Sequence, residues 1–255
     1  MFQSVKKMIG IAIKAQDGEI GAVDQLFFDD QSWAIRYLVV TIGSLLIHRK
    51  VLISPAALDG FSNHELVVNA TTDQVRNSPD IDTEKPISRE KEEELHDYYA
   101  WSYYWGYPLY YNSLGTELYP NIQYTDAFIY QLNKKNETDK DHVKAENHLR
   151  STHEVIGYSV STINGEFGYV DDFLTDTQHW GIRYLVLNTG DFLPGRKIIV
   201  AAHWVKDISW DNRSVSFDLN IDTLRNGPTY DPSIPLTRDF ERRVYEYYEK
   251  NPYWI

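Results

Sequence analysis

The sequence predicts a mainly β protein with some helix, built as two tandem small antiparallel β-barrels that are each followed by a C-terminal helix. Three observations favour this fold class. The chain repeats itself, its apolar residues come in short runs broken by Gly, Asp and Asn, and the hydrophobic period becomes helical at the end of each repeat. With 255 residues, of which 42% are hydrophobic, the chain can form two small cores.

The repeat emerges when the chain is aligned with itself at an offset of 147 residues. Residues 9–53 then align with 156–200, and 19 of these 45 positions are identical. Near residue 60 the offset becomes 149, and matches continue to Tyr104-Trp105 and Tyr253-Trp254. We interpret this as a tandem duplication. The expected units are a first domain at 1–105, an aromatic and then charged linker at 106–152, and a second domain at 153–255.

The first two thirds of each repeat predict β-strands. In the first copy we expect them at 9–15, 19–28, 34–42, 45–53 and 65–69, where short apolar and β-branched runs are bounded by turn residues. Asp17-Gly18 and Asn164-Gly165 are typical of tight hairpins, because both residue types tolerate positive φ. A few short antiparallel strands leave two exposed edges, and closing the sheet on itself would remove them. A small barrel is therefore expected.

The last third of each repeat predicts a helix packed on the barrel. Phe240, Val244, Tyr247 and Tyr248 follow a helical spacing and share one face, with Thr237 as the N-cap. In the first copy, Ser88 takes the N-cap position.

Both copies open with the same pattern: an apolar strand, then Asp/Asn-Gly-Glu-x-Gly-x-Val-Asp, a further Asp and Ile-Arg-Tyr-Leu-Val. This segment resembles the PRC-barrel family, whose barrel occurs in the photosynthetic reaction centre H subunit and in a ribosome maturation factor. The matching positions are Gly18, Glu19, Gly21, Val23, Asp24 and Asp29, and Gly165, Glu166, Gly168, Val170, Asp171 and Asp176. The resemblance implies that these are fold positions, and that the barrels are protein-interaction modules and not enzymes.

Composition excludes several functional classes. A formal charge of −12 repels nucleic acid, so no nucleic-acid partner is expected, and the absence of cysteine excludes thiolate catalysis and cysteine-bound metals. The longest nearly apolar run, 38–47, is about half of what a membrane-spanning helix needs. With no secretory signal at the N-terminus, a cytoplasmic location is expected. No phosphate-binding loop or dinucleotide fingerprint occurs, so no cofactor is predicted.

The repeated charged residues predict structural ion pairs more strongly than catalysis. Glu19 with Asp24 is a recurring carboxylate pair, but a spacing of five on a regular strand places the two side chains on opposite faces unless a bulge intervenes. Arg36 and Arg183 lie beside apolar positions, and we expect each to pair with an acid of its own copy, Asp24 or Asp29 and Asp171 or Asp176. Anion recognition by the two arginines is the functional alternative. No histidine is matched between the copies, so neither a metal site nor a catalytic residue is predicted.

The stretch from Tyr98 to Tyr130 holds ten of the nineteen tyrosines. It either wraps the chain's own barrels or forms a docking surface, which would favour a homodimer or another protein partner. The residues predicted to contact a partner are Arg36, Tyr37, Trp101, Trp105, Arg183, Tyr184 and Trp254.

We therefore expect a noncatalytic protein-interaction or scaffold module with an unidentified partner. Two alternatives stay open. One is small-ligand binding or hydrolysis in a cleft between the domains, using Arg36, Arg183 and nearby acids. The other is association with the ribosome or RNA through Arg49-Lys50 and Arg196-Lys197.

Overall fold

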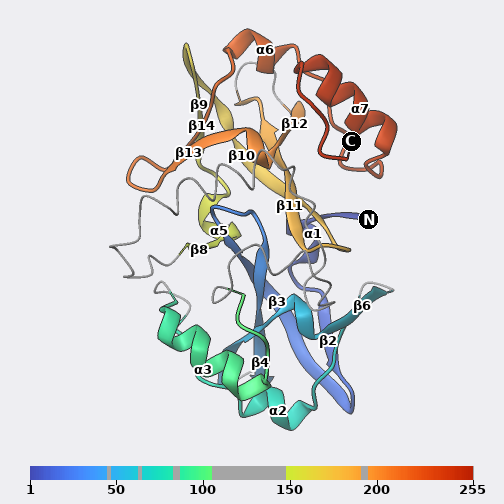
Figure 1. Ribbon diagram of the computed structural model, residues 1–255. Coiled ribbons are helices and arrows are strands. Elements are labelled where there is room, and N and C mark those ends of the chain that lie inside the picture. Colours follow the sequence, from blue (N-terminus) through green and yellow to red (C-terminus); the bar gives the residue numbers. More distant parts are fainter. Residues whose placement is uncertain (45–46, 63–64, 83–86, 105–147, 191–194, 255) are drawn as a thin grey trace.

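The computed structural model describes residues 1–44, 47–62, 65–82, 87–104, 148–190 and 195–254 (Figure 1). These residues form a mainly β fold with short helices, as predicted, and the strands make two sheets of seven. The first sheet runs in the order β5 (Ile47–Ile53), β4 (Ile35–Ser44), β3 (Gly18–Asp29), β2 (Ala12–Ala15), β7 (Glu65–Val68) and β6 (Leu58–Ser62), and β8 (Leu149–Ser151) also pairs with β3. The second runs in the order β12 (Lys197–Ala201), β11 (Gly181–Asn188), β10 (Gly165–Asp176), β9 (Ser159–Thr162), β14 (Ser214–Phe217) and β13 (Val205–Ser209), and β1 (Phe2–Ser4) also pairs with β10.

The two sheets have the same strand order, and in both the hydrogen-bonded path is open. Strands β5 and β6 end the first path and β12 and β13 end the second, so the closed barrels expected from the sequence are not formed by the described strands. The long strands β3 and β10 instead pair with strands of both halves. Each has a stretch of edge beyond its short hairpin partner, and a strand from the other half of the chain pairs there.

This exchange of strands is reciprocal. Strand β1, at the start of the first half, pairs antiparallel with the end of β10, and β8, which precedes the second half, pairs in the same way with the end of β3. The predicted domain boundaries miss this arrangement, because 1–105 contributes a strand to the second sheet and 106–152 contributes one to the first. Residues 106–147 of the predicted linker lie outside the described residues.

A short helix follows each exchanged strand and fixes it. Helix α1 (Val5–Met8) is capped by Ser4, and α5 (Thr152–Val155) is capped by Ser151. The hydroxyl of Ser4 also donates to Asp172, and that of Ser151 donates to Gln25. Because one serine serves as both cap and cross-link, the exchanged strand and its helix are held as one unit.

The two halves meet again at a pair of tryptophans. Trp33 and Trp180 both have positive φ, +60° and +47°, which costs a bulky residue on the order of 1 kcal/mol. This conformation directs each carbonyl to the other half: the amide of Ile35 donates to Trp180 at 2.7 Å, and that of Ile182 donates to Trp33 at 2.8 Å. The rings of Phe28 and Phe173, 5.9 Å apart, pack between the halves. One continuous core therefore includes buried residues of both sheets.

The repeated glycines of the opening motif lie where strands approach closely. A Cβ at Gly21 would stand 2.0 Å from the carbonyl oxygen of Thr41, and one at Gly168 would stand 1.9 Å from that of Asn188. No other residue fits such a contact. The hairpins at Asp17-Gly18 and Asn164-Gly165 are confirmed, but in each the glycine is the first residue of the second strand.

The predicted terminal helices are confirmed as α3 (Arg89–Tyr99), capped by Ser88, and α7 (Arg238–Tyr247), capped by Thr237. They lie toward opposite ends of the molecule (Figure 1). The short helices α2 (Thr72–Arg76) and α6 (Ile221–Arg225) precede them and were not predicted. Within the described ranges, no helix combines the length and apolar character needed to cross a membrane.

The exchange predicts that the halves stay together after the chain is cut between them. A site-specific protease sequence inserted after Lys140 would yield two fragments that elute as one species in size-exclusion chromatography, because cross-half strands and the shared core hold them. The matched variant adds Ser151→Pro, which removes a strand amide from the exchange. We expect this variant to separate after cleavage, and separation of the unmodified fragments would contradict the prediction.

Candidate functional site

Each half contains a cluster of polar side chains between its sheet and its terminal helix. The first cluster consists of Arg36, Tyr37, Arg89, Glu92 and Tyr104. The second consists of Arg183, Tyr184, Arg238, Glu241 and Tyr253, which are the same residue types at the repeat offsets of 147 and 149.

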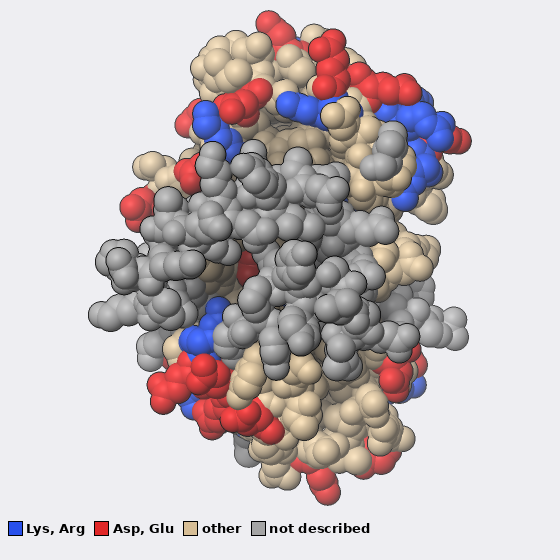
Figure 2. Space-filling model, in the orientation of Figure 1, with Lys and Arg blue, Asp and Glu red and all other residues tan. Residues whose placement is uncertain are grey.

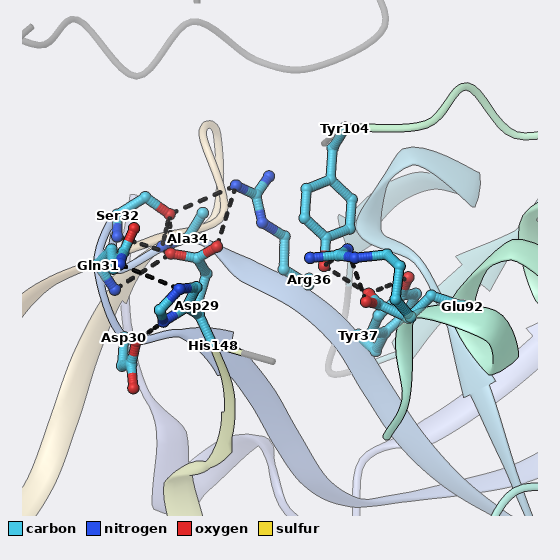
Figure 3. A network of polar contacts seen from close by, with 11 residues as sticks. Asp29, Asp30, Gln31, Ser32, Ala34, Arg36, Tyr37, Glu92, Tyr104 and His148 are labelled. Carbon is cyan, nitrogen blue, oxygen red and sulfur yellow. Dashed lines mark hydrogen bonds and ion pairs between the residues drawn. The ribbon is translucent and has the colours of Figure 1, made fainter. Parts of the chain in front are cut away.

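In the first cluster, the carboxylate of Glu92 is the centre (Figure 3). It is fully buried and accepts hydrogen bonds from the hydroxyls of Tyr37, at 2.9 Å, and Tyr104. The guanidinium of Arg89, on the same helix, lies 2.7 Å from it. Arg36 of β4 stacks over the Tyr104 ring at 4.0 Å. Helix α3 is thereby tied to β4 through a buried charge with several partners.

The second cluster repeats this arrangement. Tyr184 donates to Glu241 at 2.6 Å and Tyr253 donates to it at 3.0 Å. Arg238 lies 3.1 Å from Glu241, and Arg183 stacks over Tyr253 at 4.6 Å. Here the cluster ties α7 to β11.

Burial shifts the titration of these groups. Desolvation raises the pKa of Glu92 above its ordinary value, although the hydrogen bond from Tyr104 and the charge of Arg89 oppose it. Desolvation and the charge of Glu92 raise the pKa of Tyr104 well above 10. Desolvation and the charge of Glu241 raise the pKa of Tyr253 to about 12. A buried acid whose partners are side chains of the same chain is typical of a structural cluster.

The two arginines singled out from the sequence behave as predicted. Arg36 lies 3.8 Å from Asp29, and Arg183 lies 4.0 Å from Asp176, so each pairs with an acid of its own half. Asp176 is buried. Desolvation there is outweighed by hydrogen bonds from His179 and the Gln178 amide, which lower its pKa.

Other predicted partner-binding residues fare differently. Tyr37 and Tyr184 have no exposed surface, because each lies on a strand whose residues are buried at this point and donates to the buried glutamate of its cluster. Trp101 is half-buried and stacks on Tyr99 at 4.3 Å, while Trp254 is half-buried and packs against Tyr245 at 5.0 Å. Trp105 lies outside the described residues.

The recurring carboxylates are engaged in surface ion pairs. Asp24 lies 2.9 Å from Lys50, and Asp171 lies 2.6 Å from Lys197, whereas Glu19 and Glu166 are exposed. The bulges proposed near Gly21 and Gly168 are present as register shifts in β3 and β10.

The arginines proposed for RNA binding contact the protein's own backbone. Arg49 donates to the carbonyls of Arg76 and Ser78, and Arg196 donates to those of Arg225 and Gly227. Each arginine therefore holds the end of a short helix in its half.

Three of the described histidines have a carboxylate or a buried hydroxyl as a neighbour. His148 lies 3.1 Å from Asp30, His179 lies 2.6 Å from Asp176, and Nε2 of His96 lies 2.8 Å from the Tyr37 hydroxyl. Among the described residues, no group of three or more His, Asp or Glu could hold a metal ion.

Sequence reasoning missed Arg89 and Glu92 and their counterparts Arg238 and Glu241, although both pairs repeat as Arg-x-x-Glu at the start of a helix. That repeat was a usable signal, because two buried acids at the same position indicate a shared structural role.

Searches against protein-family models and against curated proteins found no match for this chain.

Removal of a buried carboxylate should destabilise the fold. Glu92→Ala leaves the Arg89 guanidinium and two hydroxyls without their shared partner, and we expect a loss of about 3 kcal/mol in the free energy of unfolding, measured with urea. The exposed neighbour Glu90, changed to Ala, is the matched control and should change stability by less than about 0.5 kcal/mol. Equal effects of the two changes would contradict the role of Glu92.

The pH dependence of stability should report His96. Burial lowers its pKa to about 4 from 6.5, so the unfolded chain takes up a proton on this residue first as the pH falls. Stability is therefore lost between about pH 6.5 and 4, and this part, up to roughly 3 kcal/mol, should be missing in His96→Gln. His153→Gln, at an exposed position, serves as the control. Parallel stability curves for wild type and His96→Gln would refute this assignment.

Proposed function

We propose that the protein is a noncatalytic cytoplasmic scaffold, built from two duplicated domains of the PRC-barrel type, that binds another protein. The observation that carries this proposal is the reciprocal exchange of β1 and β8. Because each half completes the sheet of the other, the two terminal helices are held at fixed positions. Two helix surfaces held in fixed positions suit the binding of a partner protein, because little conformational freedom is lost on binding, and no catalysed reaction is needed.

The equivalence of the halves supports duplication. Both sheets have the same strand order, and both terminal helices are tied down by an Arg, a Glu and two tyrosines at matching positions. The PRC-barrel resemblance rests on the opening motif of each copy, whose glycines lie at close strand contacts.

The use of the polar residues supports a noncatalytic role. The repeated arginines and buried glutamates attach the terminal helices to the sheets. The repeated aspartates Asp24 and Asp171 form ion pairs with lysines. An enzyme would direct such groups toward a substrate.

The exposed face of α3 is the surface we propose for partner binding. It presents Glu90, Glu93, Glu94 and Asp97, and acidic side chains gather there in Figure 2. The exposed side of α7 instead carries both signs of charge, with Arg238, Arg242 and Arg243 beside Asp239 and Glu246. A partner with a basic surface fits α3, and its approach is favoured by the net charge of −12.

Quantitative mass spectrometry of proteins captured from the source cell tests the proposal. We expect wild-type protein to enrich a partner that a triple variant, Glu90→Gln with Glu93→Gln and Glu94→Gln, loses by about 10-fold or more. The matched control, Asp239→Asn with Glu246→Gln on α7, should capture it normally. No enrichment over empty resin would contradict the scaffold role, and equal capture by both variants would contradict the use of α3.

A further inference from the structure

A cavity of about 420 Å³ lies where the exchanged strand β1 meets the second half of the chain. Its walls come from three elements that are far apart in sequence: β1, the turn between β10 and β11, and the segment formed by α7 and the C-terminal aromatic residues. The residues that matter for its chemistry are Phe2, Gln178, His179, Arg183, Arg238 and Trp254. A space of this size accommodates a small organic molecule.

Two arginines reach this cavity and are held in place by aromatic rings. Arg183 stacks over Tyr253 at 4.6 Å, and Arg238 stacks over Trp254 at 4.2 Å. Stacking occupies the flat faces of the guanidinium groups and leaves their edges for hydrogen bonds. One terminal nitrogen of Arg238 donates to the Tyr253 hydroxyl at 3.3 Å and lies 3.1 Å from Glu241. The Nε atom of Arg183 is buried and has no hydrogen-bond partner, and its terminal nitrogen lies 4.0 Å from Asp176, beyond hydrogen-bond range. This arginine thus has donor capacity that the protein does not satisfy.

The charge balance limits what the cavity can bind. The guanidinium groups of Arg183 and Arg238 and the N-terminal ammonium of Met1 contribute three positive charges, and Asp176 and Glu241 lie beside them with two negative charges. His179 contacts Asp176 through Nδ1 at 2.6 Å and lines the cavity as well. A single carboxylate balances the one positive charge in excess, whereas a doubly charged anion would add a negative charge next to two carboxylates.

The remaining wall is apolar and aromatic. Phe2 and Trp254 both line the cavity, and Phe2 packs edge-on against the buried Tyr184 at 5.8 Å. Apolar walls beside two fixed cations match a ligand that has a carboxylate at one end and a flat or apolar body.

The equivalent place in the first half is chemically different. Ser32 stands where the second half has His179, and the Ser32 hydroxyl lies 3.4 Å from Arg36 (Figure 3). Leu149 stands where β1 supplies Phe2. The first half has an imidazole of its own, that of His148, which lies 3.1 Å from Asp30. The aromatic wall supplied by Phe2 therefore distinguishes the second half.

We propose that this cavity binds a small monocarboxylate with a flat apolar body, with Arg183 and Arg238 holding the carboxylate and Phe2 and Trp254 contacting the body. This binding is separate from the α3 surface, so either proposal can fail without the other.

Titration calorimetry of the full chain tests the site, with benzoate as the probe. We expect saturable binding of benzoate, and weakening by about 10-fold or more in Arg238→Gln and in Trp254→Ala. Arg242→Gln is the matched control, because Arg242 is an exposed arginine of the same helix that pairs with Asp239 at 2.9 Å. It should bind benzoate as the wild type does. Arg183→Gln should abolish binding, and its urea unfolding curve checks that the variant is folded.

Several outcomes would overturn the proposal. These are no binding of benzoate at about 10 mM, where weak sites still respond, equal weakening by Arg238→Gln and Arg242→Gln, or tighter binding of inorganic phosphate than of benzoate. Binding of benzyl alcohol as tight as that of benzoate would show that the arginines do not recognise the charge, and would overturn it too.

Discussion

The pairing of each half's leading strand with the long strand of the other half is the constraint on which the rest of the structure depends. Strands β3 and β10 extend past their hairpin partners, and without β8 and β1 the ends of both would expose unpaired amides and carbonyls. The strained Trp33 and Trp180 are tolerated because each places a carbonyl in a hydrogen bond with the opposite half. Core continuity and the cavity beside Arg183 both follow from this joining of the halves.

Within each half, one buried glutamate sets the position of the terminal helix. Glu92 and Glu241 would each be costly alone, since a charge without partners in the interior destabilises a protein by several kcal/mol. Two tyrosine hydroxyls and one arginine compensate the buried charge of Glu92. They come from Tyr37 on the strand, Arg89 on the helix and Tyr104 after the helix. Such a cluster contributes to the register of helix against sheet more than to net stability. A one-turn shift of α3 would leave the acid without its partners.

The sequence predicted the elements whose cause is local. Hairpins at Asp17-Gly18 and Asn164-Gly165, the N-caps Ser88 and Thr237, and the pairing of Arg36 and Arg183 with acids of their own halves follow from turn chemistry, capping and the cost of burying a charge. The exchange of β1 and β8 could not be predicted, because three-residue strands leave no periodic signal and their partners lie more than a hundred residues away. The same long-range origin hid the cavity, whose walls come from both ends of the chain.

Equivalent positions that differ between the halves show which residues can change without loss of the fold. Inside the clusters, Arg, Tyr and Glu are the same in both halves, because each has several partners that would be lost together. Beside them, Tyr245 occupies the position equivalent to His96, and His179 occupies the position equivalent to Ser32. The hydrogen bonds centred on the two glutamates do not include these four side chains, so their chemistry can change while each cluster keeps its helix in place. The difference between His96 and Tyr245 is buried, whereas His179 lines the cavity, so only the second difference changes a surface that a ligand can reach.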